Sequence, residues 1–202
     1  MRRLSKILSY LFHPMLMPSL GTFFILNVVP HHSLLPFSIK RIVYIVVFAS
    51  TCLLPLSLLP LFLQTKVIKS FEMETSRERI APALSSAIFF FLGYFLLFRL
   101  NISSLIESFL LASFFAVILS SVISIYWKIS LHALAIGGVT GLILALIFRY
   151  GIDLLLLLSI MVLISGIVAT ARLYLKAHTP LQVFIGYLVG LGVVLLSLLY
   201  VF

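Results

Sequence analysis

Long, unbroken apolar stretches follow one another along almost the whole sequence. About 20 apolar residues in a helix span the hydrocarbon core of a bilayer, whereas a strand of a membrane barrel needs roughly 10 residues of alternating polarity. In lipid every backbone amide must be paired within the protein. The stretches therefore predict an all-α, polytopic transmembrane helix bundle. They lie near residues 8–29, 40–63, 83–99, 104–126, 131–149, 153–174 and 180–202.

Two of these stretches leave details open. The stretch 83–99 is short, so we expect six or seven spanning helices, with 83–99 tilted, re-entrant or incompletely spanning. In the first stretch His13, Pro14 and Pro18 interrupt the apolar pattern and no cleavage site of small residues is present. We interpret it as a retained first span rather than a signal peptide, with His13 packed at the interface.

The composition excludes a soluble globule. Only 9% of the residues are charged and 63% are hydrophobic, whereas a soluble domain has about 25% charged residues. The net charge of +9 comes from bases at the ends of the apolar stretches. That placement is typical of membrane topology and of contact with anionic head groups. We therefore expect an integral membrane protein with membrane lipids as partners, and no nucleic acid.

Three polar segments interrupt the apolar pattern, at 64–82, 128–132 and 172–178. The first holds seven of the 19 Asp, Glu, Lys and Arg residues. By itself it is typical of a solvated amphipathic helix that links two spans. Two apolar stretches separate each segment from the next, and an even number of crossings returns the chain to the same side. We therefore expect all three segments at one membrane surface.

The side chains of these segments suit a phosphate group. Arginine presents a planar fork of donors that matches phosphate oxygens, and lysine adds a point charge. Histidine supplies acid–base or nucleophilic capacity near neutral pH. A metal centre fits less well, because Mg²⁺ requires carboxylates and Zn²⁺ usually requires three or four close ligands. The residues predict a phosphate site without a metal or another cofactor.

The spacing of these residues resembles the signatures of the type 2 phosphatidic acid phosphatase superfamily. Arg172, followed after five residues by His178, resembles the third signature, which runs Ser-Arg, five residues, His, three residues, Asp. Ser130 and His132 in the order Ser-Leu-His resemble the second signature, Pro-Ser-Gly-His. The order and separation of the signatures agree over about residues 66–190.

The first signature of that family, Lys, six residues, Arg-Pro, is matched in degenerate form. The basic segment that ends at Arg77, Arg79 and Pro82 resembles it, and Lys69 is a spatial substitute for the lysine. Gln182 stands where the family has the Asp of its third signature. A glutamine oxygen can accept the imidazole N–H, but it carries no negative charge.

The resemblance implies a single phosphatase-like membrane domain over residues 1–202. It would hydrolyse a lipid phosphate monoester or diphosphate, in phospholipid metabolism, at the surface of the bacterial inner membrane. His178 would be the nucleophile that forms a phosphohistidine, His132 the general acid, and Arg172 the clamp on the phosphoryl oxygens. Gln182 would orient the nucleophile. The remaining phosphate contacts would come from Arg77, Arg79, Ser130 and Lys69.

Alternatives remain open for the residues and for the whole chain. His132 and His178 can be interfacial residues at helix starts, Arg172 a basic flank, and Ser130 a helix cap. The chain can also be a degenerate member that binds anionic lipid without turnover, since loss of an analogous carboxylate in a serine protease costs about 10⁴ in rate. A third alternative is a lipid phosphotransferase. Ten of the 14 bases fall on the side of the polar segments, which favours the cytoplasmic side, whereas the resemblance implies the outer face.

Overall fold

The fold is a bundle of membrane-spanning helices. The computed structural model describes residues 1–70, 73, 75 and 77–201. Over these residues the secondary structure is helical, and seven segments are long and apolar enough to cross a membrane. The predicted all-α bundle is thus confirmed, with seven spans rather than six. The spans are Arg2–Val28, Phe37–Gln64, Arg77–Leu100, Ser104–Tyr126, Leu131–Tyr150, Leu155–Tyr174 and Pro180–Tyr200.

The third span is longer than its apolar stretch indicates. Helix α7 runs over Ile80–Leu100, 21 residues, which at 1.5 Å per residue gives about 31 Å. Pro82 lies in the first turn of the helix, where a missing N–H breaks no internal hydrogen bond. The segment therefore reaches the length of a full span, and the expected short or re-entrant helix is not found.

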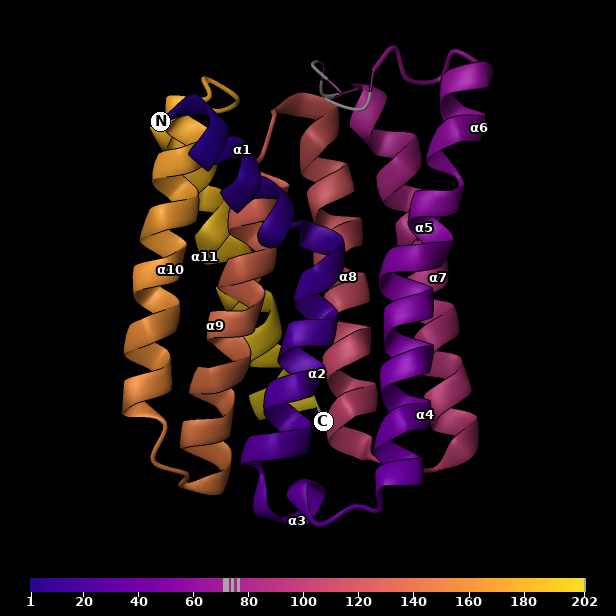
Figure 1. Ribbon diagram of the computed structural model, residues 1–202, viewed down its shortest axis with the longest axis vertical. Coiled ribbons are helices and arrows are strands. Elements are labelled where there is room, and N and C mark those ends of the chain that lie inside the picture. The colour runs from indigo at the N-terminus through magenta and orange to yellow at the C-terminus, as the bar shows by residue number, and fades with distance from the viewer. Residues whose placement is uncertain (71–72, 74, 76, 202) are drawn as a thin grey trace.

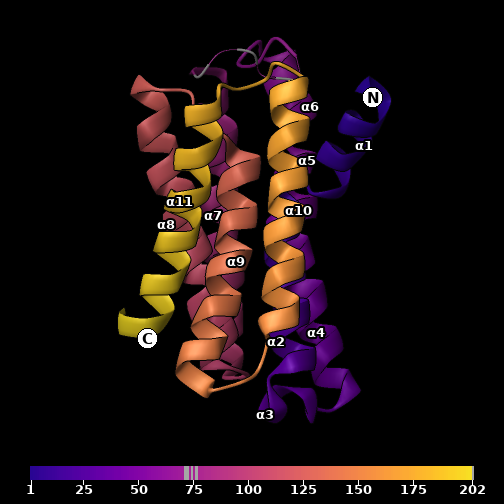
Figure 2. The same cartoon turned by 90° about the vertical axis from the view of Figure 1, so that its left-hand side faces the viewer.

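The first span is broken near its middle. Helix α1 covers Arg2–Leu11, a 3₁₀ turn covers Pro14–Leu16, and helix α2 covers Met17–Val28. Proline at position 14 has no N–H to continue the helix. The N–H of His13 donates to the carbonyl of Tyr10 at 3.3 Å, one residue later than a continuing α-helix requires. As a result α1 leans away from the axis of α2 (Figures 1 and 2).

The second span is also segmented. It consists of α4 (Phe37–Phe48), a π-helical turn (Ala49–Leu53), α5 (Leu54–Ser57) and α6 (Leu59–Gln64), and the short helix α3 (Pro30–Ser33) precedes it. Pro55 and Pro60 explain the interruptions, since proline removes an internal hydrogen bond and clashes with the preceding turn.

The centre of the bundle is α9 (Leu131–Tyr150), with α8 (Ser104–Tyr126) and α10 (Leu155–Tyr174) on its two sides (Figure 1). Helix α11 (Pro180–Leu196) packs closely against it. At Gly137 and Gly141 a Cβ atom would overlap the backbone of α11, and at Gly190 it would overlap the Leu134 carbonyl of α9. These glycines allow the two backbones to touch. The contact fixes the start of α9 relative to the start of α11.

The three polar segments lie at one end of the bundle, together with the N-terminus (Figure 1). The links α6–α7, α8–α9 and α10–α11 all lie there. The first link differs from the expected amphipathic helix in the part that the structure describes. Helix α6 ends at Gln64, Lys66 has a left-handed backbone (φ 59°), and only a 3₁₀ turn at Arg77–Arg79 precedes α7. Glu72 and Glu74 lie outside the described residues.

Candidate functional site

His178 and Gln182 form the best-defined part of the site. They lie in the α10–α11 link and the first turn of α11, where Thr179 and Gln182 make reciprocal capping hydrogen bonds. The side-chain oxygen of Gln182 accepts from the backbone N–H of Thr179 at 3.1 Å, and the same atom lies 3.2 Å from Nδ1 of His178. A backbone N–H can only donate, so this atom is the carbonyl oxygen. Nδ1 of His178 therefore carries the proton, and Nε2 carries the lone pair.

Arg79 faces that lone pair. Its Nη1 lies 3.3 Å from Nε2 of His178, and its Nε donates to the carbonyl of Met73 at 3.0 Å. A guanidinium has no acceptor, so this contact requires the same tautomer of His178 as the contact with Gln182. Both Arg79 and His178 are 8% exposed.

The surroundings keep His178 neutral. Burial is the largest cause, followed by the positive charges of Arg79 and Arg172, and together they lower the pKa of His178 to about 3. The hydrogen bond to Gln182 raises the pKa by a smaller amount, and Lys128 lowers it slightly. At neutral pH the ring is therefore an uncharged imidazole with an unprotonated Nε2, which is the protonation state that a nucleophile requires.

Arg172 and His132 meet at Ser9 of α1. Nη1 of Arg172 donates to Oγ of Ser9 at 3.2 Å, and Nε2 of His132 lies 3.1 Å from the Ser9 carbonyl oxygen. The ring of His13 lies edge-on to the ring of His132, with centroids 5.7 Å apart. Arg172 belongs to the last turn of α10 and His132 to the first turn of α9. The two predicted catalytic residues are thus joined through a residue of the first span.

Ser130 is a helix cap in this structure. Its Oγ accepts from the backbone N–H of Ala133 at 3.4 Å at the start of α9, and the side chain is fully buried. Its backbone N–H donates to the carbonyl of Gln182 at 3.3 Å. Ser130 therefore ties the beginning of α9 to the beginning of α11, which is the structural alternative stated above.

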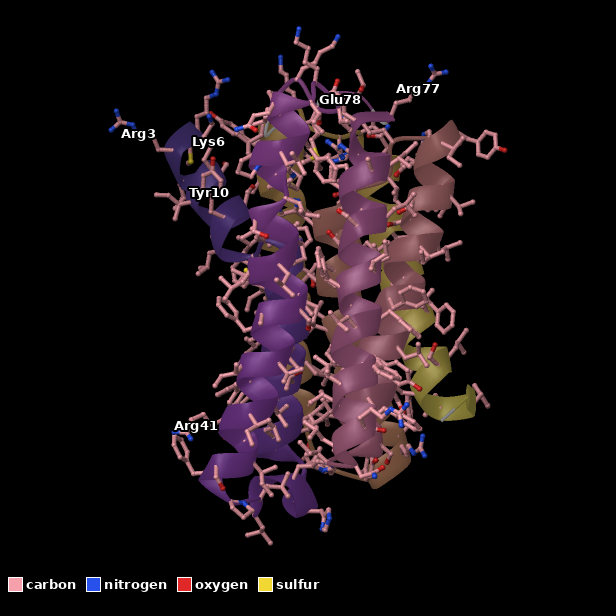
Figure 3. All side chains as sticks on the ribbon, turned by 90° about the vertical axis from the view of Figure 1, so that its right-hand side faces the viewer. Arg3, Lys6, Tyr10, Arg41, Arg77 and Glu78 are labelled. Atoms are coloured by element: carbon pink, nitrogen blue, oxygen red, sulfur yellow. The ribbon has the colours of Figure 1, made fainter. Side chains whose placement is uncertain are left out.

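Two residues expected to bind phosphate lie away from this group. Arg77 is exposed and points away from the bundle (Figure 3). Arg77 and Arg79 share a 3₁₀ turn, and at three residues per turn, side chains two positions apart face different directions. Lys69 is exposed in the α6–α7 link. Only Arg79 of these three contacts His178, so the positions of Arg77 and Lys69 do not support their assignment as phosphate ligands.

A cavity of about 640 Å³ opens between α1, α7, α8, α9 and α10. Its wall near the polar end includes Arg79, Lys128, His132, Arg172 and Lys176. Further along the helices the wall is apolar, and it includes Phe90, Phe109, Val139 and Val194. The cavity therefore combines a basic end with an apolar interior.

His178 lines a second, more open pocket beside this cavity, together with Gln182 and Thr179. Lys128 and Lys176 line both hollows. His178 and Arg79 thus stand at the boundary between them, with Nε2 directed at the arginine that belongs to the larger cavity.

Helix α1 supplies residues that the signatures do not include. Ser9 and His13 line the larger cavity with Lys6 and Arg2, whereas the sequence favours His13 as a packing residue. A signal is present in the sequence, since Ser5, Ser9 and His13 are polar residues that recur every four positions in a largely apolar stretch. That spacing puts them on one helix face.

The arrangement as a whole is a neutral histidine among cations, beside the basic end of a cavity whose interior is apolar. Among the residues that the structure describes, no group of three or more His, Cys, Asp and Glu side chains is placed to hold a metal ion. Comparisons with protein-family models, curated proteins and solved structures give no match for this chain.

Proposed function

We propose that the protein hydrolyses the phosphate monoester or diphosphate of a membrane lipid, without a metal, through a phosphohistidine intermediate on His178. The observation that supports this most is the buried, neutral His178 whose Nε2 lone pair faces the guanidinium of Arg79 at 3.3 Å. This contact supports the proposal because a nucleophile and a cation that binds phosphoryl oxygens must both reach the same phosphoryl group. The proposed setting is the bacterial inner membrane, as the family resemblance implies.

The first chemical step would be attack of Nε2 of His178 on phosphorus. The new N–P bond forms as the bond from phosphorus to the lipid oxygen breaks. Nδ1 of His132 takes the proton of the phosphate monoanion and gives it to that leaving oxygen. Arg172 and Arg79 bind the phosphoryl oxygens, where negative charge must be stabilised in the transition state. Arg79 Nη1 contacts Nε2 of His178, so phosphate binding must draw its guanidinium from the histidine to the phosphoryl oxygens.

The second step would be attack of water on the phosphohistidine. Nδ1 of His132 now takes a proton from the water, the N–P bond breaks, and His132 gives this proton to the departing inorganic phosphate while His178 returns to its neutral form. The Nε2–H of His132 is held by the Ser9 carbonyl, so both proton transfers run through Nδ1. Gln182 keeps Nδ1 of His178 protonated throughout.

The cavity supports an amphiphilic substrate. A phosphate group matches the basic end, and the apolar wall at Phe90, Phe109 and Val139 matches a hydrocarbon chain. Phosphatidic acid, phosphatidylglycerophosphate and polyprenyl diphosphate all have this form, and the cavity does not choose among them.

A second candidate function is binding of anionic lipid without turnover. Gln182 favours it, because a neutral amide does not stabilise the imidazolium that develops when His178 attacks. The contact of Arg79 with Nε2 favours it as well, since this hydrogen bond uses the lone pair that a nucleophile needs.

Phosphate release from detergent-solubilised protein in the presence of EDTA tests the proposal. We expect release from lipid phosphates by the wild type and none by His178→Ala, with His31→Ala as a matched control because His31 is exposed. An acid-labile phosphoprotein should accumulate in the wild type only. Equal release by the wild type and His178→Ala would overturn the catalytic role.

Lipid binding without phosphate release in the wild type, if it is retained in His178→Ala, supports the second candidate function. Transfer to an added alcohol would identify a phosphotransferase.

A further inference from the structure

Helix α1 presents its polar face to the bundle and its apolar face outward. Ser5 and Ser9, one turn apart, are buried, while Leu4, Ile7 and Leu11 are 55–60% exposed. This is the pattern of a helix that borders a polar cavity inside a membrane protein. It places Ser9 next to Arg172 and His132, which come from α10 and α9.

The hydroxyl group of Ser9 is fixed in one orientation. It donates its hydrogen to the carbonyl of Ser5 at 2.9 Å. Its lone pairs are then directed away from α1, and one of them accepts from Nη1 of Arg172 at 3.2 Å. A hydroxyl whose only hydrogen is engaged within its own helix can act only as an acceptor towards Arg172.

The carbonyl of Ser9 is available because the helix ends beside it. In a continuing helix the N–H of His13 would donate to this oxygen, but it donates to Tyr10. Helix ends leave carbonyl groups that need other partners, and these carbonyls carry the negative end of the helix dipole. Nε2 of His132 lies 3.1 Å from the Ser9 oxygen. A carbonyl oxygen can only accept, so Nε2 of His132 carries a proton and Nδ1 carries the lone pair.

We propose that Ser9 is a positioning residue of the phosphate site. Its hydroxyl holds the guanidinium of Arg172, and its carbonyl fixes His132 in the Nε2–H tautomer, which leaves Nδ1 as the nitrogen that exchanges protons. The break at His13 and Pro14 is what makes one residue available for both contacts. The expected effect of Ser9 on turnover rests on the proposed function. Its expected effect on the binding of inorganic phosphate is independent of that function.

Ser9→Ala tests the hydroxyl, with Ser5→Ala as the matched control. Ser5 lies on the same face of the same helix and is buried to the same degree, and its hydroxyl donates to the carbonyl of Met1. We expect Ser9→Ala to weaken binding of inorganic phosphate, measured by calorimetry in detergent, by about 10-fold, because a hydrogen bond to a charged group is lost. Ser5→Ala should change it less than 2-fold, and Ser9→Thr should restore most of the loss.

The carbonyl contact is tested without any substitution at Ser9. In protein labelled with ¹⁵N-histidine, the signals that disappear in His132→Asn belong to His132. Their shifts should show a protonated Nε2 and an unprotonated Nδ1 at neutral pH. The opposite tautomer would overturn the proposal, and so would equal phosphate affinities of Ser9→Ala and Ser5→Ala in folded protein.

The same experiments separate this inference from the proposed hydrolysis. If the wild type releases no phosphate from lipids but Ser9→Ala still binds inorganic phosphate about 10-fold more weakly, the positioning role stands and hydrolysis fails. If the wild type hydrolyses lipid phosphate and Ser9→Ala matches Ser5→Ala in both kcat and KM, hydrolysis stands and the positioning role fails.

Discussion

The side-chain oxygen of Gln182 accepts the N–H of His178 at Nδ1, and it also accepts the backbone N–H of Thr179. One atom thus caps α11 and selects the tautomer of the histidine. The capping geometry holds the oxygen in place without any charge. Gln182 therefore orients the imidazole of His178 as a carboxylate would. Unlike a carboxylate, it provides no negative charge to stabilise the protonated ring.

Gln182→Glu should add the negative charge that the glutamine lacks. Glutamate is a standard residue at this position of a capping box, so the helix start is kept while a negative charge is placed next to Nδ1. We expect the pKa of His178 to rise from about 3, and phosphate release to increase on the order of 10-fold or more, because the imidazolium formed on attack is stabilised. NMR titration of labelled histidine and steady-state kinetics measure the two effects. A variant with an unchanged pKa would show that the contact between residues 178 and 182 does not form.

Acid should destabilise the fold through His178. Its pKa is lowered to about 3 in the folded protein, against about 6.5 in an unfolded chain. Between these values the unfolded state binds the additional proton, so the stability that the neutral ring contributes is present above about pH 6.5 and is lost progressively as the pH falls towards 3. His178→Asn should therefore lose less stability than the wild type between pH 6.5 and 4.5. Thermal unfolding followed by the fluorescence of Trp127, the single tryptophan, measures this.

The control for this pH dependence is His31→Asn, because His31 is exposed. Its unfolding midpoint should follow that of the wild type at each pH. If His178→Asn also follows the wild type, the buried histidine does not contribute to acid lability.

Arg79 and Arg77 should differ sharply in their effect on anion binding. Arg79 is buried and contacts His178, whereas Arg77, two positions earlier, points into solvent (Figure 3). Arg79→Gln should weaken binding of inorganic phosphate by roughly 10- to 100-fold, the range of a lost hydrogen bond to a charged group. Arg77→Gln should change it by less than about 3-fold, as for an exposed charge. Calorimetry with both variants in the same detergent is the measurement, and similar losses in both would contradict the assignment.

The helical bundle and the meeting of the polar segments follow from the sequence for a simple reason. Every apolar stretch except 83–99 clearly has the length that the bilayer requires, and counting each stretch as one crossing places 64–82, 128–132 and 172–178 at the same end. Span length and crossing parity do not depend on side-chain packing. Gly137 and Gly141 leave room for a neighbouring backbone, and the structure identifies α11 as the helix that fills it.

Details of the site depend on local backbone geometry that the sequence pattern does not reveal. A 3₁₀ turn turns Arg77 away from Arg79, and the left-handed backbone at Lys66 replaces an expected helix with a loop. The contact of Ser9 with Arg172 joins residues 163 positions apart. It depends on the angle at which α1 leaves the bundle, and spacing within one stretch does not encode that angle.

Gly190→Ala should lower the stability of the protein and weaken phosphate binding, although residue 190 does not belong to the site. Gly192→Ala is its matched control on the same helix. A Cβ at position 190 would overlap the carbonyl of Leu134, which belongs to a helix backbone and cannot swing aside, whereas nothing lies within 4 Å of a Cβ at position 192. Separating α11 from α9 should cost about 1–3 kcal/mol or more. For a chain of this size that lowers the unfolding midpoint by roughly 2–12 °C. Gly192→Ala should leave stability unchanged or raise it by up to about 1 kcal/mol.

Reaction of the buried Cys52 with a thiol-reactive dye on heating gives the unfolding midpoints of both variants. Since α11 begins beside His178, the first variant should also bind phosphate more weakly, and equal midpoints for the two variants would contradict the close packing of α9 and α11.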